Sequence, residues 1–185
     1  MVNREFELKF TVPDEDALLN IFRQKDIRLS SPVIQIDTIF LRKGRTFDHL
    51  EKGEPVIRIR QEGGLFMTTI KKYKKGISDR VEVECEINDG STFHEYLELL
   101  DILPVIVVKK SRMKGSYKDI SICFDHVNDL GIFLEMEIIT DEHHASREME
   151  RLKGVATELG LNINNVIGVP YDVMLYDKIT GGKNV

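Results

Sequence analysis

The feature that most constrains the fold of this chain is an alternation of charged and apolar residues that recurs in segment after segment. It is strict in residues 3–10, where charged and apolar side chains alternate from Glu5 to Phe10. Successive side chains of a β-strand point to opposite faces of the sheet, so a period of two is typical of strands. We therefore predict strands with one charged face and one apolar face.

The same pattern predicts about eight strands in all. They cover residues 3–10, 33–42, 55–61, 65–72, 80–87, 105–112, 117–125 and 132–138. Helical periodicity predicts helices at residues 13–25 and 91–100, a third whose apolar stripe runs from Ala145 to Leu159, and a short C-terminal helix that includes Tyr171. Gly63-Gly64 predicts a hairpin turn between the third and fourth strands. The fold class expected is α+β with an antiparallel sheet.

Composition narrows the class of protein. The 185 residues fit a single domain, and the formal net charge of −5 argues against a general nucleic-acid binder. The chain shows no apolar run of membrane-spanning length and begins with charged residues, so no membrane partner is expected. Cys85 and Cys123 lie far apart without CxxC spacing and are interpreted as free thiols of a reducing compartment, which predicts a cytoplasmic location.

The charged faces carry mainly Arg, Lys and Glu, and two interpretations remain open for them. An open antiparallel sheet with one solvated side also alternates in this way. Alternatively, eight strands close into a barrel whose charged faces point inward. Cations that face one another there would repel, and a polyanion with its metal ions would relieve that repulsion. Arg and Lys suit phosphate oxygens, and Glu pairs suit a divalent metal.

The charged segments resemble, in order along nearly the whole chain, the motifs of the CYTH family, the triphosphate tunnel metalloenzymes. That family includes class IV adenylyl cyclases, thiamine triphosphatases and inorganic triphosphatases. The motifs are Glu5-Phe6-Glu7-Leu8-Lys9 (ExExK), Arg58-Ile59-Arg60 (RxR), Thr69-Ile70-Lys71 (TxK), Arg80–Glu84 (RxExE), Lys110-Ser111-Arg112 (KxR), Asp125 with Gly131, and Glu135-Met136-Glu137 (ExE).

The resemblance implies a single CYTH-like domain over residues 1–185, folded as a closed eight-stranded antiparallel barrel with helices packed outside. It also implies Mg²⁺ or Mn²⁺ as the cofactor. The implied metal ligands are Glu5, Glu7, Glu135 and Glu137, with Asp125, Glu82 and Glu84 either as further ligands or as groups that orient the cations. The implied substrate-binding residues are Lys9, Arg58, Arg60, Lys71, Arg80, Lys110 and Arg112.

Lys71 and Lys9 are the candidate catalytic residues, because a lysine among cations holds its proton less tightly and can act as a general base. Lys71 is favoured because the TxK lysine is tied to catalysis in related hydrolases. In thiamine triphosphatases a Tyr works with that lysine, and Ile39 occupies its place here. A second departure is Pro170, which replaces the Ser of the family's C-terminal Ser-Tyr.

The function expected is that of a metal-dependent enzyme acting on a triphosphate-bearing substrate, which would be ATP, tripolyphosphate or thiamine triphosphate. A class IV adenylyl cyclase-like reaction is the first candidate, and a triphosphate hydrolase is the second. A non-catalytic nucleotide or polyphosphate sensor is the third, and a homodimer is left open. The basic run Lys71–Lys75 suggests nucleic-acid binding, but ahead of Gly76 it fits a solvated turn better.

Overall fold

The computed structural model describes residues 4–50, 53–73, 80–140 and 144–182, except for the side chains of residues 4, 5, 73, 80 and 81. The strands are β1 (Arg4–Thr11), β2 (Val33–Arg42), β3 (Pro55–Glu62), β4 (Leu65–Tyr73), β5 (Arg80–Ile87), β6 (Ile102–Tyr117), β7 (Ile120–Val127) and β8 (Gly131–Thr140). The α-helices are α1 (Glu15–Gln24), α2 (Gly90–Leu99), α3 (Ala145–Glu158) and α4 (Tyr171–Thr180), and the short 3-10 helices are η1 (Phe47–His49) and η2 (Ile163–Asn165).

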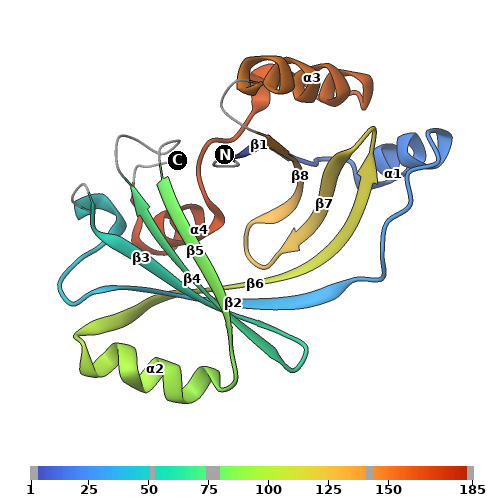
Figure 1. Cartoon of the computed structure of the whole chain (residues 1–185). Helices are drawn as coiled ribbons and strands as arrows, with labels where there is room; N and C mark the ends of the chain where they lie inside the picture. Colours follow the sequence, from blue (N-terminus) through green and yellow to red (C-terminus); the bar gives the residue numbers. More distant parts are fainter. Residues whose placement is uncertain (1–3, 51–52, 74–79, 141–143, 183–185) are drawn as a thin grey trace. The chain divides into compact units, whose positions relative to one another are not determined.

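The strands form one eight-stranded sheet in the order β1-β8-β7-β6-β2-β3-β4-β5 (Figure 1). This confirms the predicted α+β class with an antiparallel sheet. In the part of the chain that the structure describes, β1 and β5 stand at the two ends of that order. Closure of the sheet into a barrel is therefore not shown and remains a prediction.

Most predicted elements lie within a few residues of their observed bounds, and the hairpin at Gly63-Gly64 joins β3 to β4 as expected. The main difference is β6, which was predicted at residues 105–112 and is 16 residues long. β7 starts at Ile120 because Lys118 and Asp119 form the turn with φ of 50° and 60°. A turn of two left-handed residues without glycine gives little signal in the sequence.

The chain divides into two compact units, and β6 crosses from one to the other at Lys110–Ser111. Unit 1 comprises residues 1–33 and 111–168, and unit 2 comprises residues 34–110 and 169–185. The prediction of a single domain over residues 1–185 stays a prediction.

Unit 1 has its hydrophobic core on one face of β1, β7 and β8. Phe124, Leu134 and Met136 are fully buried there, together with Phe22 of α1 and Leu152 of α3. Burial of large apolar side chains from both helices stabilises this layer. The opposite face of the same strands carries the charged residues, as the alternation predicted.

Unit 2 carries a helix on each side of its strands (Figure 1). Leu97 of α2 packs with Phe40, Ile57 and Ile59 on the apolar face. On the other face, the ring of Tyr171 at the start of α4 lies 5.2 Å from Lys110 Nζ. The charged face of this unit is therefore the one on which α4 begins.

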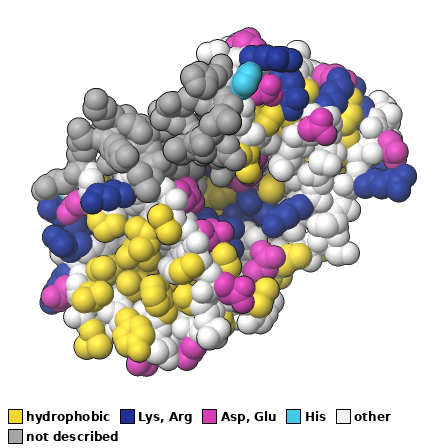
Figure 2. Space-filling view, in the orientation of Figure 1, with side chains coloured by type: hydrophobic (Ala, Val, Ile, Leu, Met, Phe, Trp, Pro, Cys, Tyr) yellow, Lys and Arg dark blue, Asp and Glu magenta, His cyan; other side chains and the backbone are white. Residues whose placement is uncertain are grey.

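Apolar side chains also gather on the surface of unit 2 (Figure 2). Its exposed large apolar residues include Ile34, Leu65, Ile70, Val83, Tyr96, Leu99, Leu100 and Val107.

Within the described ranges, none of the helices combines the length and the apolar character needed to cross a membrane.

Candidate functional site

The charged face of unit 1 is assembled by the pairing of β1, β8 and β7. The register places Lys9 opposite Glu135 and Glu7 opposite Glu137. Lys9 Nζ lies 3.6 Å from a carboxylate oxygen of Glu7 and 3.6 Å from one of Glu135, and the lysine is only 6% exposed. The two ends of the predicted site, ExExK and the late ExE, are thus side by side in the sheet.

Arg112 on β6 joins this face by contacting two further carboxylates. It donates hydrogen bonds to both oxygens of Asp125, which is fully buried on β7, and to Glu135. Burial opposes the charged form of Arg112, but the hydrogen bond with Asp125 and the charge of Glu135 outweigh it and raise the pKa of the guanidinium. Arg112 is therefore held rigidly between two strands.

Cys123 lies on the same face, opposite Glu135 in the β7–β8 register. It is 8% exposed, and burial raises the pKa of its thiol despite the charge of Arg112. A thiol held in its neutral form is a poor nucleophile, so Cys123 acts as a small packing residue beside the charged groups.

The charged face of unit 2 contains a bidentate pair between Arg60 on β3 and Asp37 on β2. Arg60 Nε and Nη2 donate to the two carboxylate oxygens of Asp37, each at 2.7 Å. Lys110 Nζ lies 4.0 Å from the same carboxylate. Burial opposes the ionised form of Asp37, yet the hydrogen bond and charge of Arg60 lower its pKa. Planar paired hydrogen bonds of this kind are strong and directional.

Arg58 lies two residues before Arg60 on β3, and fewer of its N–H donors are hydrogen-bonded. Its Nη2 donates to Thr69 Oγ1 at 2.8 Å and to Glu84 at 3.1 Å. Its buried Nε has no hydrogen-bond partner in the described part of the chain. Burial lowers the pKa of Arg58, and the charge of Arg60 lowers it further. A buried N–H donor without an acceptor raises the free energy of the folded protein, so Arg58 has a donor that an anion could satisfy.

Two further residues complete the charged face of unit 2. Lys71 Nζ lies 3.3 Å from Glu82 of the next strand. Ile39, which replaces the family's Tyr, is directly opposite Arg58 in the β2–β3 register and is buried. On the β2 side of Arg58, an apolar side chain thus stands where a Tyr hydroxyl group was considered.

Among the side chains that the structure describes, six cations of the predicted site each have a carboxylate within 4.0 Å, and we call them the clamp cations. They are Lys9, Lys110 and Lys71, with Arg58, Arg60 and Arg112. The sequence argument expected cations that repel one another, and it overlooked Asp37 as the counter-ion of Arg60. Glu82 and Glu84, which were given as metal ligands or orienting groups, contact Lys71 and Arg58 in the structure.

The predicted metal ligands are brought together only in part. Glu7, Glu135, Glu137 and Asp125 belong to the face of unit 1, whereas Glu82 and Glu84 belong to unit 2. Among the described residues, no group of three or more His, Cys, Asp or Glu side chains is arranged to hold a metal ion. The side chains of Glu5 and Arg80 lie outside the described residues, as does the end of the basic run Lys71–Lys75.

Sequence reasoning missed Asp172, in the first turn of α4. Its carboxylate accepts a hydrogen bond from the backbone N–H of Val173 at 3.0 Å. Burial raises its pKa, although the charges of Lys71 and Arg58 act in the opposite direction. The only signal in the sequence was an acidic residue early in a helix, which is common at surfaces as well.

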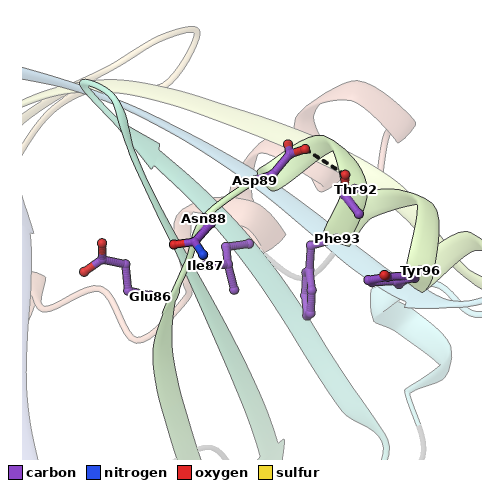
Figure 3. A pocket seen from close by; sticks show the side chains of 7 residues that line it. All are labelled: Glu86, Ile87, Asn88, Asp89, Thr92, Phe93 and Tyr96. Carbon is purple, nitrogen blue, oxygen red and sulfur yellow. Dashed lines mark hydrogen bonds between the residues drawn. The ribbon is translucent and has the colours of Figure 1, made fainter.

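A shallow pocket on unit 2 lies where β5 leads into α2 (Figure 3). It is lined by Glu86, Ile87, Asn88, Asp89, Thr92, Phe93 and Tyr96. The carboxylate of Asp89 is occupied there, because it accepts hydrogen bonds from Thr92 and from the backbone of Ser91. None of the clamp cations lines this pocket, so we do not place the site there.

Comparison with known proteins identifies relatives of this chain and structures with the same fold. A protein of Methanocaldococcus jannaschii named "Putative adenylate cyclase" is 26% identical over 170 residues, covering 90% of this chain and 95% of that protein. The structure of a "putative adenylate cyclase" from Vibrio parahaemolyticus superposes with a TM-score of 0.78 at 23% identity, covering 93% of this chain and 97% of that one.

A third relative is a protein of Hippeastrum, described as a "putative adenylyl cyclase" with a dominant triphosphatase activity. Its structure has a TM-score of 0.67 at 16% identity and covers 98% of this chain and 97% of that one. The CYTH domain matches residues 3–167, which include all the strands and all six clamp cations. The chain therefore belongs to the CYTH domain family.

Proposed function

We propose that this protein is a divalent-metal-dependent enzyme that binds a triphosphate-bearing substrate through the clamp cations. The observation that carries the proposal is Arg58, whose buried Nε donor has no acceptor among the described residues. Arg60 follows two residues later on β3, and Lys71 is on the paired strand β4, two residues beyond the partner of Arg58. Phosphate oxygens are the acceptors that arginine pairs with best. The closed barrel predicted from the sequence is part of this proposal.

A divalent metal suits the face of unit 1. Glu7 and Glu137 are directly opposite each other on β1 and β8, which places two carboxylate groups on neighbouring strands of one face. Both donors are hard carboxylate oxygens, which Mg²⁺ and Mn²⁺ prefer. Glu7, Glu135 and Glu137 are the residues that would hold such an ion. When bound, the ion would offset charge on the phosphate oxygens.

The residues of the chain would then bind and orient the phosphates. Phosphoryl transfer depends mainly on positioning and on compensation of the developing charge. Arg58, Arg60 and Lys110 are suited to grip oxygens in unit 2, and Lys9 and Arg112 are suited to do so in unit 1. Lys9 and Lys110 are only 6% and 4% exposed, so water screens their charges less than it screens charges at the surface.

Two reactions compete for the bound triphosphate. Attack by the ribose 3′-hydroxyl of ATP on the α-phosphorus gives cyclic AMP and pyrophosphate, and the name of the Methanocaldococcus relative favours this cyclase reaction. Attack by water on the terminal phosphorus gives phosphate, and the activity described for the Hippeastrum relative favours this hydrolysis. We take the cyclase reaction as the first candidate. We also propose a cytoplasmic location, because free thiols such as Cys85 and Cys123 persist in a reducing compartment.

The deciding experiment compares ATP, tripolyphosphate and thiamine triphosphate with Mg²⁺ and with Mn²⁺, and measures cyclic AMP, pyrophosphate and phosphate. Cyclic AMP with pyrophosphate identifies the cyclase, and phosphate alone identifies the hydrolase. Binding without turnover would leave a nucleotide or polyphosphate sensor. If tripolyphosphate neither binds nor raises the melting temperature at concentrations well above micromolar, the clamp cations do not form a polyanion site.

A further inference from the structure

The apolar face of the unit 2 strands continues beyond the part that α2 covers. On this face Ile57 of β3 is opposite Ile70 of β4, and Ile70 is opposite Val83 of β5. The exposed fraction rises along this row from 5% to 40% and then to 61%. Ile57 packs with Leu97 of α2, whereas Ile70 and Val83 remain open to solvent. The helix of unit 2 therefore leaves an apolar part of its sheet uncovered.

This open area is continuous with the exposed side of α2. Cys85 follows Val83 on the same face of β5 and is exposed. Ile87, the next residue on that face, lines the shallow pocket together with Phe93 and Tyr96 of α2 (Figure 3). Positions three and four residues apart share one side of a helix, so the exposed apolar residues at the end of α2 extend the same surface.

We call this surface the open apolar face, and it lies in the region of unit 2 where apolar side chains gather (Figure 2). Its members are Ile70, Val83 and Cys85 of the strands and Tyr96, Leu99 and Leu100 at α2.

The size of the open apolar face matches what a stable dimer needs. Five of its six side chains are 40% to 82% exposed, and Cys85 is exposed as well. A large side chain has on the order of 150–200 Å² of surface, so together they expose about 500–700 Å². The largest apolar patch of a typical monomer measures about 300–600 Å². A standard interface buries about 800 Å² on each partner, of which about two-thirds is apolar in homodimers.

The charges around the open apolar face favour a second copy of this chain as the partner. Two-fold symmetry brings the same patch of both copies together, so the patch has to complement itself. Lys72 is exposed on β4, two residues beyond Ile70, and Glu95 is exposed on α2 beside Tyr96. A rim that carries both signs of charge can pair across a two-fold axis, whereas a rim of one sign would repel its own copy.

We propose that the open apolar face is the interface of a homodimer in which two copies meet through α2, β4 and β5. This interface lies on the side of the strands opposite to the clamp cation Lys71 and its partner Glu82, because successive side chains of a strand point to opposite faces. Dimerisation through it leaves the charged face of unit 2 uncovered. The inference therefore holds or fails independently of the proposed triphosphate binding.

Sedimentation equilibrium of the full chain measures the association. We expect the wild type to be a dimer at micromolar concentrations, as is usual for interfaces of this size. Val83→Lys and Leu99→Lys each place a charge in the apolar contact and should weaken the dimer by at least about 30-fold. Both replaced side chains are exposed in the monomer, so the circular dichroism spectrum should stay that of the wild type.

Ile179→Lys is the matched control for Leu99→Lys. Ile179 is 68% exposed in the last turn of α4, and Leu99 ends α2. The two helices lie on opposite sides of the unit 2 strands (Figure 1). Ile179→Lys should therefore keep the wild-type Kd of the dimer.

A second measurement needs no substitution. Cys85 belongs to the open apolar face, and Cys123, the other cysteine of the chain, is buried. The rate of maleimide labelling at Cys85, followed by mass spectrometry, should fall by about 10-fold or more when the protein concentration is raised well above the Kd of the dimer, because only the monomer exposes this thiol. In Leu99→Lys the rate should not depend on concentration in the same range.

Three results would overturn the inference. The first is a wild type that sediments as a monomer throughout, which would leave the open apolar face to a partner of another kind. The second is a dimer in which Cys85 reacts as fast as in the monomer, since that dimer would use another surface. The third is a Kd that Val83→Lys and Leu99→Lys leave unchanged, or that Ile179→Lys weakens to the same extent.

Discussion

Replacement of Arg58 by Ala separates the stability of the empty protein from its affinity for phosphate. In the structure, Arg58 donates to Thr69 and to Glu84, and the Thr69 hydroxyl itself donates to Glu84 at 2.7 Å. Glu84 therefore keeps a partner when the arginine is removed, and its side chain is 47% exposed. We expect the free energy of unfolding to fall by no more than about 1 kcal/mol, the range of exposed ion pairs.

The effect on binding should be much larger. The Arg58 side chain is 16% exposed, and its Nε donor is available for an anion. Truncation of one partner of a buried charged hydrogen bond costs about 2–4 kcal/mol, which corresponds to a Kd for tripolyphosphate weaker by about 30- to 900-fold. Isothermal titration calorimetry measures the Kd, and urea unfolding measures stability.

Arg28→Ala is the matched control, because Arg28 is 84% exposed and pairs only with the exposed Asp26 among the described contacts. It should change the Kd by less than about 2-fold, since exposed charges are screened by salt. A change below about 3-fold in Arg58→Ala, or an equal loss in Arg28→Ala, would show that Arg58 does not bind phosphate specifically.

Three further variants test other parts of the molecule. Glu7→Gln should abolish metal-dependent turnover without changing the circular dichroism spectrum, and the control variant Glu150→Gln on α3 should remain active. Near-normal activity of Glu7→Gln with Mg²⁺ and Mn²⁺ would refute the assignment of Glu7 as a metal ligand. Asp37→Asn should lower the free energy of unfolding by about 3–5 kcal/mol in urea titrations, because it removes the negative charge and one of the two oxygens that pair with the buried Arg60. A loss below about 1 kcal/mol would contradict this. Hydrogen bonds from Lys118, Tyr117 and Lys25 lower the pKa of Glu158 from 4.5 to about 2, so they stabilise the protein fully above pH 4.5 and progressively less as the pH falls toward 2. The difference in the free energy of unfolding between the wild type and Glu158→Gln should therefore narrow between pH 4.5 and pH 2. A difference that stays constant over that interval would contradict this role of Glu158.

The faces of the strands could be predicted from the sequence because a period of two follows directly from strand geometry. The bounds of β2 and β5 and the separation of Ile57 and Ile59 from Arg58 were found in this way. The ion pairs could not be found, because they depend on the register between strands that are distant in sequence. Asp37 and Arg60 are 23 residues apart, and nothing local in either strand specifies the other.

Asp172 could not be predicted for a related reason. Burial raises its pKa, and the charges of Lys71 on β4 and Arg58 on β3 oppose that rise. A single acidic residue in the first turn of a helix has the same local sequence signature whether it faces water, as Asp16 does, or a cluster of cations. The tertiary environment, not the local sequence, distinguishes the two.

The pairing of each clamp cation with a carboxylate implies that phosphate binding is an exchange of ions. Under the proposed function, a phosphate oxygen that binds Arg60 or Lys71 would compete with Asp37 or Glu82 for that cation. The displaced carboxylates would then carry uncompensated charge close to a polyanion, unless they take up protons or metal ions. If the proposed function is correct, the protein exchanges phosphate for carboxylates of its own chain, and the heat of binding should depend on the ionisation enthalpy of the buffer.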